Sequence, residues 1–214
     1  MNVHRVTKRT WIVYVFLLVL LFGMAFFLWE YITQAQRWVA ATGSPHLYNN
    51  SNIGCGTITD RTGTVLLDIS TQRSYASDEV TRKSTLHWLG DRQGFINASA
   101  VSGYADEMAG YDKVSGVYAA SGEGGRAELT ISAWAQNTAL EALGDRKGTV
   151  AVYNYKTGEI LCAVTNPTYD PDQVPDIAGD TSGTFDGVYL NRFLQTSYVP
   201  GSIYKIVSLA AALE

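Results

Sequence analysis

One segment organises this sequence: Tyr198-Val199-Pro200-Gly201-Ser202-Ile203-Tyr204-Lys205. It opens a run from Ile203 to Leu213 that is apolar or small except at Lys205 and Ser208. A helix that is apolar on all sides is typically a buried helix. Because proline and glycine are excluded from a helix interior, the Pro-Gly pair places the start of this helix at or next to Ser202.

Ser202 and Lys205 carry the chemistry that this segment predicts. They are three residues apart, so a helix presents both on one face. Apolar surroundings disfavour the charged ammonium and lower the pKa of a lysine, so a neutral Lys205 can take the proton of a nucleophilic Ser202. The helix N-terminus adds N–H groups and a partial positive charge where an oxyanion would form. Serine and lysine are common, however, and the pair alone also fits a helix start with a lysine that reaches to solvent.

Three further blocks precede this segment along the chain. In chain order, the four blocks are Thr157-Gly158-Glu159-Ile160-Leu161-Cys162, Pro167-Thr168-Tyr169-Asp170-Pro171-Asp172, Asn191-Arg192 and Tyr198 to Lys205. Together, they resemble the start of the transpeptidase domain of penicillin-binding proteins. The resemblance implies that Ser202 is the nucleophile and Lys205 the general base of an acyl transfer.

The run from Trp11 to Trp29 contains no charged residue, and its length is close to the roughly 20 residues that cross a bilayer. Basic residues precede it and Glu30 follows it, so the positive-inside rule places the N-terminus in the cytoplasm. We therefore expect a cytoplasmic tail at 1–10 and a transmembrane helix at 11–30. A cleaved signal peptide is the alternative, but its apolar core usually has only about 7–15 residues.

Residues 31–128 are expected to form a small, mixed, non-catalytic domain outside the membrane. Gly54 to Leu67 predicts strand, turn and strand, with Gly63 supplying the turn dihedral and Asp60-Arg61 as a turn-stabilising pair. This block resembles the segment that follows the anchor in class B, the monofunctional penicillin-binding proteins. The roughly hundred residues available are too few for the glycosyltransferase domain of the bifunctional class.

Residues 129–214 are expected to form the N-terminal part of the transpeptidase domain. Leu129 to Ser132 predicts a strand end whose last residue caps a helix, and Ala133 to Leu143 predicts that helix, closed by Gly144. Gln136 stands where the family's entry to this domain also has glutamine, whereas Ser132 replaces the usual aspartate. Serine caps helices as well, so this departure is expected to be harmless.

A hairpin is predicted next, from Thr149 to Tyr153 and from Glu159 to Val164, where apolar and polar residues alternate. Its turn contains Lys156-Thr157-Gly158, which spells the Lys-Thr-Gly motif of the superfamily. The catalytic copy of that motif follows the serine, whereas this one precedes it. We interpret it as a turn. Pro167 to Asp186 is predicted to be loop.

Other chemistries find little support in the sequence. His46 and His87 would suggest a Ser-His-Asp hydrolase, but no Gly-x-Ser-x-Gly elbow occurs. Cys55 and Cys162 lack metal-ligand spacing, and either buried free thiols or a single bridge between them remains open. The loop at 167–186 lacks the ligand pattern of a calcium site, so neither a metal nor an organic cofactor is expected. A net charge of −4 without a basic stripe argues against nucleic acid as a partner.

With 214 residues, 46% hydrophobic and 17% charged, the chain can bury a core. We predict an α+β fold: an N-terminal transmembrane helix, a small mixed linker or pedestal domain, and the incomplete start of a penicillin-binding/β-lactamase-like transpeptidase domain. By the resemblance, the protein is a peptidoglycan D,D-transpeptidase of the cell membrane. Its partners would be peptidoglycan stem peptides, β-lactams, the membrane and, among proteins, membrane components of cell division or elongation.

Two alternatives belong to other functional classes. One is a truncated, non-catalytic, membrane-anchored remnant or scaffold. The other is a β-lactam sensor, for which the tail at 1–10 is too short to hold a signalling portion. The Ser-x-Asn and Lys-Thr/Ser-Gly motifs that follow the serine helix in the family are not found after Ser202 in these 214 residues. We therefore expect the 214 residues alone not to turn over a peptide substrate.

Overall fold

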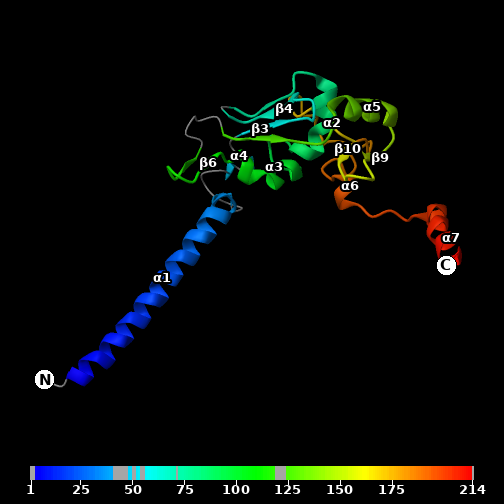
Figure 1. The fold of residues 1–214 in the computed structure, drawn as a ribbon. Helices are drawn as coiled ribbons and strands as arrows, with labels where there is room; N and C mark the ends of the chain where they lie inside the picture. The colour runs from blue at the N-terminus through cyan, green and yellow to red at the C-terminus, as the bar shows by residue number, and fades with distance from the viewer. Residues whose placement is uncertain are drawn as a thin grey trace. The chain divides into compact units, whose positions relative to one another are not determined.

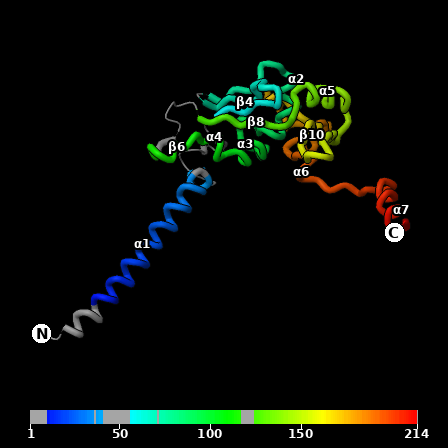
Figure 2. Tube along the Cα trace, in the orientation of Figure 1, coloured from blue at the N-terminus to red at the C-terminus, as the bar shows by residue number. Residues whose placement is uncertain are grey.

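The computed structural model describes residues 3–40, 48–49, 52–53, 56–70, 72–118 and 124–213. These residues form two compact units (Figures 1 and 2). The first unit takes its described residues from Met1–Thr57, Asp68–Arg73 and Tyr104–Ala127. The second takes its residues from Ile58–Leu67, Ser74–Gly103 and Glu128–Glu214.

The long helix α1, Val3–Val39, dominates the first unit (blue in Figure 1). Its segment Thr10–Ala35 has a mean hydropathy of 2.7 and no buried residue in its most apolar part, so it is long and apolar enough to cross a membrane. The sequence prediction of a spanning helix is confirmed on length and composition. Strands β1 (Tyr48–Asn49) and β2 (Asn52–Ile53) of this unit pair in antiparallel fashion.

The rest of the first unit is short helix and hairpin. Helix α4 is Ala105–Met108, and strands β6 (Tyr111–Asp112) and β7 (Val117–Tyr118) pair in antiparallel fashion. Cys55 and His46 lie outside the described residues.

A four-stranded sheet has the order β5-β4-β3-β8. The predicted strand, turn and strand are confirmed, with Gly63 at φ +85° in the turn. The predicted strand end at Leu129–Ser132 is wrong in its bounds, because the last strand ends at Glu128. Leu129 still donates its N–H to the carbonyl of Thr59 at 2.9 Å. The bounds are β3 Thr57–Thr59, β4 Val65–Asp68, β5 Ser74–Tyr75 and β8 Arg126–Glu128.

Asp60 organises the turn of this sheet, but without the predicted help of Arg61. The buried Asp60 carboxylate accepts hydrogen bonds from the backbone N–H groups of Thr62 (2.8 Å) and Thr64 (2.9 Å) and from that of Ala133 (3.1 Å). Burial raises the pKa of Asp60, but these hydrogen bonds and that of the Thr62 hydroxyl outweigh it and keep the pKa below its ordinary value. Among the described ion pairs, none involves the Arg61 side chain. The backbone N–H of Arg61 donates to the carbonyl of Ile131 at 3.1 Å.

The second unit contains three helices that precede its hairpin: α2 (Glu79–Leu89), α3 (Ser99–Gly103) and α5 (Ala133–Leu143). Helix α5 has the predicted bounds, with the Ser132 side chain accepting from Ala135 N–H and Gly144 at φ +52° as the C-cap. Helix α2 begins after Asp78, whose carboxylate accepts from the N–H and the hydroxyl of Thr81 at 2.8 Å. At each N-terminus, the side chain of the capping residue thus accepts from one backbone N–H that has no partner within the helix.

The predicted hairpin is confirmed as strands β9 (Gly148–Tyr153) and β10 (Ile160–Asn166), which pair in antiparallel fashion. Lys156-Thr157-Gly158 lies in its turn, as expected, with Gly158 at φ +79°. The core face of β10 carries Cys162 and Val164, which pack with Ala139 of α5. Cys162 is a free, buried thiol, and Cys55 lies outside the described residues.

The chain then runs as loop from Pro167 to Leu190, which includes the predicted loop, and enters α6 (Arg192–Gln195). A second apolar cluster fixes this loop: Tyr169 and Val188 pack with Leu86 of α2 and with Ile96. The last elements are the 3₁₀ helix η1 (Gly201–Tyr204) and helix α7 (Lys205–Leu213).

Candidate active site

The predicted serine segment forms helix close to where the sequence places it. Helical structure begins at Gly201, one residue before Ser202, and Gly201 itself adopts φ +55°. The first turn is a 3₁₀ helix, however, and α-helix begins only at Lys205. A 3₁₀ helix has three residues per turn, so Ser202 and Lys205 still lie on one side of the segment. The shared face is therefore confirmed in outline.

The predicted burial of this segment is wrong in the structure. Residues 199–213 are all exposed, including Ile203 at 75% and Leu209 at 62%. The reason is physical: an apolar helix is buried only if another element covers it. Nothing among the described residues of this chain provides that cover. Lys205 is therefore exposed to solvent.

Ser202 and Lys205 are also not yet linked to each other. Across residues 124–213, no hydrogen bond joins Ser202 Oγ to Lys205 Nζ. The backbone N–H of Lys205 donates to the carbonyl of Ser202, which closes the first turn. The N–H of Ile203 donates to the carbonyl of Pro200 at 3.2 Å. The N–H of Ser202 lies at the start of the helix, where N–H groups have no acceptor within the helix and can bind an oxyanion.

The Asn-Arg block anchors the chain just ahead of the serine segment. The buried Asn191 caps α6, because its Oδ1 accepts from the N–H groups of Phe193 (3.1 Å) and Leu194 (3.3 Å). Its Nδ2 donates to the backbone carbonyl of His87 at 3.2 Å. The N–H of Arg192 donates to Thr165 Oγ1 on β10 at 3.1 Å. The block therefore ties α6 to both α2 and the hairpin.

His87 holds the preceding loop against α2. It is 2% exposed, and its Nε2 lies 2.8 Å from the carbonyl of Val188. Because a carbonyl only accepts, Nε2 carries the proton of the neutral ring. Burial lowers the pKa of His87 to about 4, against the smaller opposing effect of this hydrogen bond. A neutral histidine bonded to a carbonyl in the core positions the loop, in agreement with the sequence interpretation that it is not a catalytic base.

The Pro-x-Tyr-Asp-Pro block fixes the loop after β10 to the same helix. Tyr169 is buried in the apolar cluster with Leu86, and burial raises the pKa of its hydroxyl. Asp170 accepts two hydrogen bonds from Arg82, at 2.8 Å from Nε and 2.6 Å from an Nη. The two side chains are 4% and 12% exposed, so this is a nearly buried, bidentate ion pair. The Arg82 hydrogen bond is the main cause of the lowered pKa of Asp170.

Gln136 and Trp88 join the helices to the inner strand of the hairpin. The Gln136 amide is fully buried, donates to the carbonyl of Ser84 at 3.1 Å and accepts from the N–H of Ala163 at 2.7 Å. Trp88 Nε1 donates to the carbonyl of Ala163 at 2.7 Å. Strand β10 is therefore held on one side by backbone pairing and on its core side by side chains of α2 and α5.

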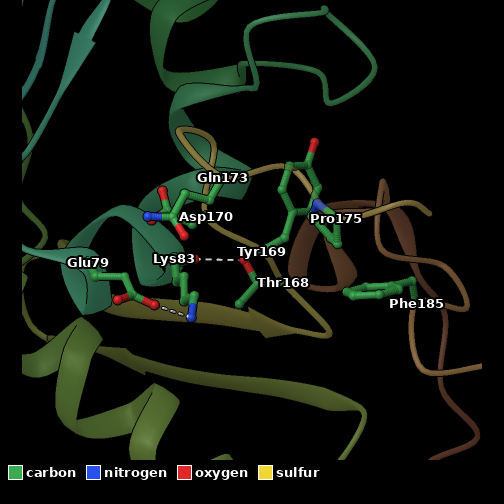
Figure 3. A pocket seen from close by; sticks show the side chains of 8 residues that line it. All are labelled: Glu79, Lys83, Thr168, Tyr169, Asp170, Gln173, Pro175 and Phe185. Carbon is green, nitrogen blue, oxygen red and sulfur yellow. Dashed lines mark hydrogen bonds and ion pairs between the residues drawn. The ribbon is translucent and has the colours of Figure 1, made fainter.

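A cavity of about 240 Å³ opens in this scaffold (Figure 3). It is distinct from the serine segment, which contributes none of its lining. Its charged side chains are neutralised locally, since Lys83 pairs with Glu79 and Asp170 with Arg82. Among the described residues, no group of three or more His, Cys, Asp or Glu could hold a metal ion. The lining residues are Glu79, Lys83, Thr168, Tyr169, Asp170, Gln173, Pro175 and Phe185.

The sequence was compared with models of known protein families. Residues 148–214, from the first strand of the hairpin through the serine segment, match the family model of the penicillin-binding protein transpeptidase domain. The match extends over less than half of the chain, and in this part the chain is similar to that transpeptidase domain. The resemblance predicted from the four blocks is confirmed, and the transpeptidase segment supplies β9, β10, α6 and α7.

Named relatives agree with the family. The chain is 32% identical over 104 residues to the peptidoglycan D,D-transpeptidase PbpA of Mycolicibacterium smegmatis and 31% identical over 106 residues to PbpA of Mycobacterium tuberculosis. Each alignment covers 42% of this chain and 21% of the relative, so the chain spans only about a fifth of their length. It is also similar to the solved D,D-transpeptidase domain of a peptidoglycan glycosyltransferase from Eggerthella lenta, at a TM-score of 0.58 and 27% identity over 75% of this chain and 37% of that one.

The sequence did not identify the residues that hold the transpeptidase segment from outside it. Arg82, Trp88 and Ser84 all belong to α2 and all contact β10 or the loop after it, directly or through Gln136. The available signal was Asp78, an N-cap residue followed by an acidic first turn, which marks the start of α2. No signal in the sequence pairs Arg82 with Asp170, because they are 88 positions apart.

Proposed function

We propose that this chain is the membrane-anchored N-terminal part of a monofunctional penicillin-binding protein that cross-links peptidoglycan as a D,D-transpeptidase. One observation carries the proposal: the match to the transpeptidase family over residues 148–214 includes Ser202 and Lys205 in the Ser-x-x-Lys order. Ser202 is the nucleophile and Lys205 is its general base.

The chemistry is an acyl transfer in two steps. Ser202 Oγ attacks the carbonyl carbon of the penultimate D-alanine of a stem peptide, and its proton passes to the neutral amine of Lys205. The bond to the terminal D-alanine breaks, and the leaving amine takes up a proton. An amine of a neighbouring strand then attacks the acyl-enzyme, which releases Ser202 and forms the cross-link. A β-lactam acylates the same oxygen by opening its ring.

This mechanism requires surroundings that helix α7 lacks among the described residues. Lys205 acts as a base only if it is neutral, and desolvation is what favours the neutral amine. An apolar cover over Ile203, Ile206 and Leu209 would provide it, since these side chains lie next to the pair in sequence and are exposed. The apolar surface of α7 therefore has a chemical role: it would exclude water from the lysine once it is covered.

Helix α1 places the protein in the cell membrane in this proposal. The basic residues before Trp11 and the Glu30 after the span put the N-terminus in the cytoplasm and the serine segment outside. Stem peptides and β-lactams are then reached from the outer side. Partners among the membrane proteins of cell division or elongation would meet α1 within the bilayer.

Acylation tests the proposal directly. The protein with all residues that follow in its gene is incubated with a fluorescent penicillin, denatured and separated on a gel. We expect a covalent label that is lost in Ser202→Ala and is strongly reduced in Lys205→Ala. Ser208→Ala, six residues after Ser202 and in α7, is the matched control and should keep the label. An unlabelled protein that still inserts into membranes would favour the non-catalytic scaffold instead.

A further inference from the structure

The β6–β7 hairpin is hydrogen-bonded to α1 near the C-terminal end of its apolar segment. The hydroxyl of Tyr31 donates to the backbone carbonyl of Lys113 at 2.9 Å and lies 3.2 Å from the hydroxyl of Tyr111. Because the Tyr31 proton is directed to Lys113, Tyr111 is the donor of the second bond. The Lys113 ammonium donates to the carbonyl of Ile32 at 2.7 Å. We call these three hydrogen bonds the hairpin latch.

The latch sits where a bilayer would end. If the uncharged run to Trp29 fills the hydrocarbon, Tyr31 and Ile32 lie about 3–5 Å beyond it at 1.5 Å per residue. The headgroup layer on each side of the hydrocarbon is roughly 5–8 Å thick. Tyrosine and tryptophan prefer this layer, because one end of each ring is polar and the other apolar. The latch therefore holds the hairpin at headgroup depth.

The hairpin turn is closed by side-chain hydrogen bonds and presents one apolar side chain. The Asp112 carboxylate accepts from Val114 N–H at 2.9 Å and from the Ser115 hydroxyl at 2.6 Å, and Gly116 adopts φ +71°. Val114 at the tip is 96% exposed. A single exposed valine needs no explanation on an ordinary surface. Val114, however, follows Lys113 directly, so its Cα is about 3.8 Å from a residue bonded to the end of the apolar span.

The geometry points to a second membrane contact. The β6–β7 hairpin rests on the outer surface of the bilayer that α1 crosses, with Val114 inserted among the lipid headgroups and upper acyl chains. The contact is with lipid of any headgroup charge, because the hairpin offers an apolar tip and its Asp112 and Lys113 side chains are occupied by the turn and the latch. This contact would fix how far the hairpin lies from the bilayer surface. This inference rests on the proposed membrane insertion of α1.

A depth measurement in vesicles tests the contact. The 214-residue chain with Cys55→Ser is reconstituted into phosphatidylcholine vesicles, and Val114→Cys is labelled with an environment-sensitive fluorophore. Cys162 is 2% exposed and should not react in the folded chain. We expect a blue-shifted emission that is quenched by lipids with a nitroxide near the headgroup and little by lipids with a nitroxide at the chain end. Phe16→Cys, in the middle of the span, is the reference and should be quenched by the deep nitroxide.

The two labels distinguish the hairpin contact from the membrane insertion of α1. A quenched Phe16→Cys label with an aqueous Val114→Cys label overturns the hairpin contact and leaves the anchor in place. An aqueous Phe16→Cys label overturns both.

The latch itself is tested by Tyr31→Phe in the Val114→Cys background. Loss of a typical hydrogen bond shifts an equilibrium about fivefold, so the loss of two should free most hairpins and abolish most of the shallow quenching. Tyr14→Phe, the same change inside the span, is the matched control and should leave it unchanged. Equal quenching in Tyr31→Phe and Tyr14→Phe would contradict the latch.

Discussion

Strand β10 and helix α7 belong to the same compact unit and are both rich in apolar residues, yet their surroundings are opposite. Cys162, Ala163 and Val164 of β10 are 0–3% exposed, whereas Leu209 of α7 is 62% exposed. The strand is covered because α2 and α5 bring side chains that both pack on it and bond its polar groups. Helix α7 is also apolar, but no element among the described residues packs against it. Apolar sequence thus specifies that a surface must be covered, but the covering element decides whether it is.

The largest expected loss of stability in the region around β10 is that of Arg82→Ala. In Arg82→Ala, the Asp170 carboxylate stays nearly buried without its partner, and the loop after β10 loses one of its ties to α2. Removing one partner of a buried ion pair costs about 3–5 kcal/mol in the free energy of unfolding. Urea unfolding of the detergent-solubilised chain, followed by tryptophan fluorescence, measures it.

Lys83→Ala is the matched control for that experiment. Lys83 lies next to Arg82 on α2, but its pair with Glu79 is an exposed pair within one helix, worth about 0.3–0.5 kcal/mol. Equal losses in the two variants would mean that burial of the Arg82–Asp170 pair adds nothing to stability.

Lowering the pH should reduce the free energy of unfolding, because His87 is buried in its neutral form. The unfolded chain takes up a proton near pH 6.5, whereas the buried ring does so only at about pH 4. Stability is therefore fully present above pH 6.5 and is lost as the pH falls from 6.5 towards 4, by about 3 kcal/mol at 1.36 kcal/mol per pKa unit. Urea unfolding at a series of pH values measures this slope.

His87→Gln should flatten that slope between pH 6.5 and 4.5. The carboxylates with lowered pKa, Asp60 and Asp170, lose their stabilising effect only at lower pH, as the pH falls through their folded-state values. Their contribution thus lies in a separate window. An unchanged slope between pH 6.5 and 4.5 in His87→Gln would show that His87 does not titrate as a buried group.

Gln136→Ala should have the next largest effect. It leaves the Ala163 N–H and the Ser84 carbonyl buried without their partner, which costs about 2 kcal/mol in the free energy of unfolding. Thr138→Ala, also on α5, removes a hydroxyl bonded only to a carbonyl of its own helix and should change stability by less than about 0.5 kcal/mol. Similar values for the two would argue that the amide bridge to β10 is not needed.

Local features of the fold could be predicted from the sequence. Ser132 and Gly144 set the bounds of α5, Gly63 set a turn, and alternation set the β9–β10 hairpin, because each depends on residues within a few positions. The four blocks located the serine segment by resemblance. The domain bounds 1–10, 11–30, 31–128 and 129–214 remain predictions.

The remainder depended on contacts between distant positions. Arg82 with Asp170 and Gln136 with Ser84 join residues 88 and 52 positions apart, and no periodicity encodes such a pair. The burial of α7 was predicted from its composition, but burial is a property of two surfaces and the sequence displays only one. Ser202 and Lys205 were therefore located along the chain, while the surroundings that would activate them were not.

The smallest expected effect tests the exposed region itself. Leu209→Ala in the 214-residue chain removes a side chain that contacts mainly solvent, so the free energy of unfolding should change by less than about 0.5 kcal/mol. Leu86→Ala, the same change in the buried cluster of α2, should cost about 3 kcal/mol, since Leu86 is fully buried. In a protein whose further residues cover α7, the Leu209 value should rise towards that of Leu86, and penicillin labelling of Ser202 should fall as water reaches Lys205. A Leu209 variant that stays neutral there, with labelling intact, would mean that the apolar face of α7 neither stabilises the domain nor shields its base.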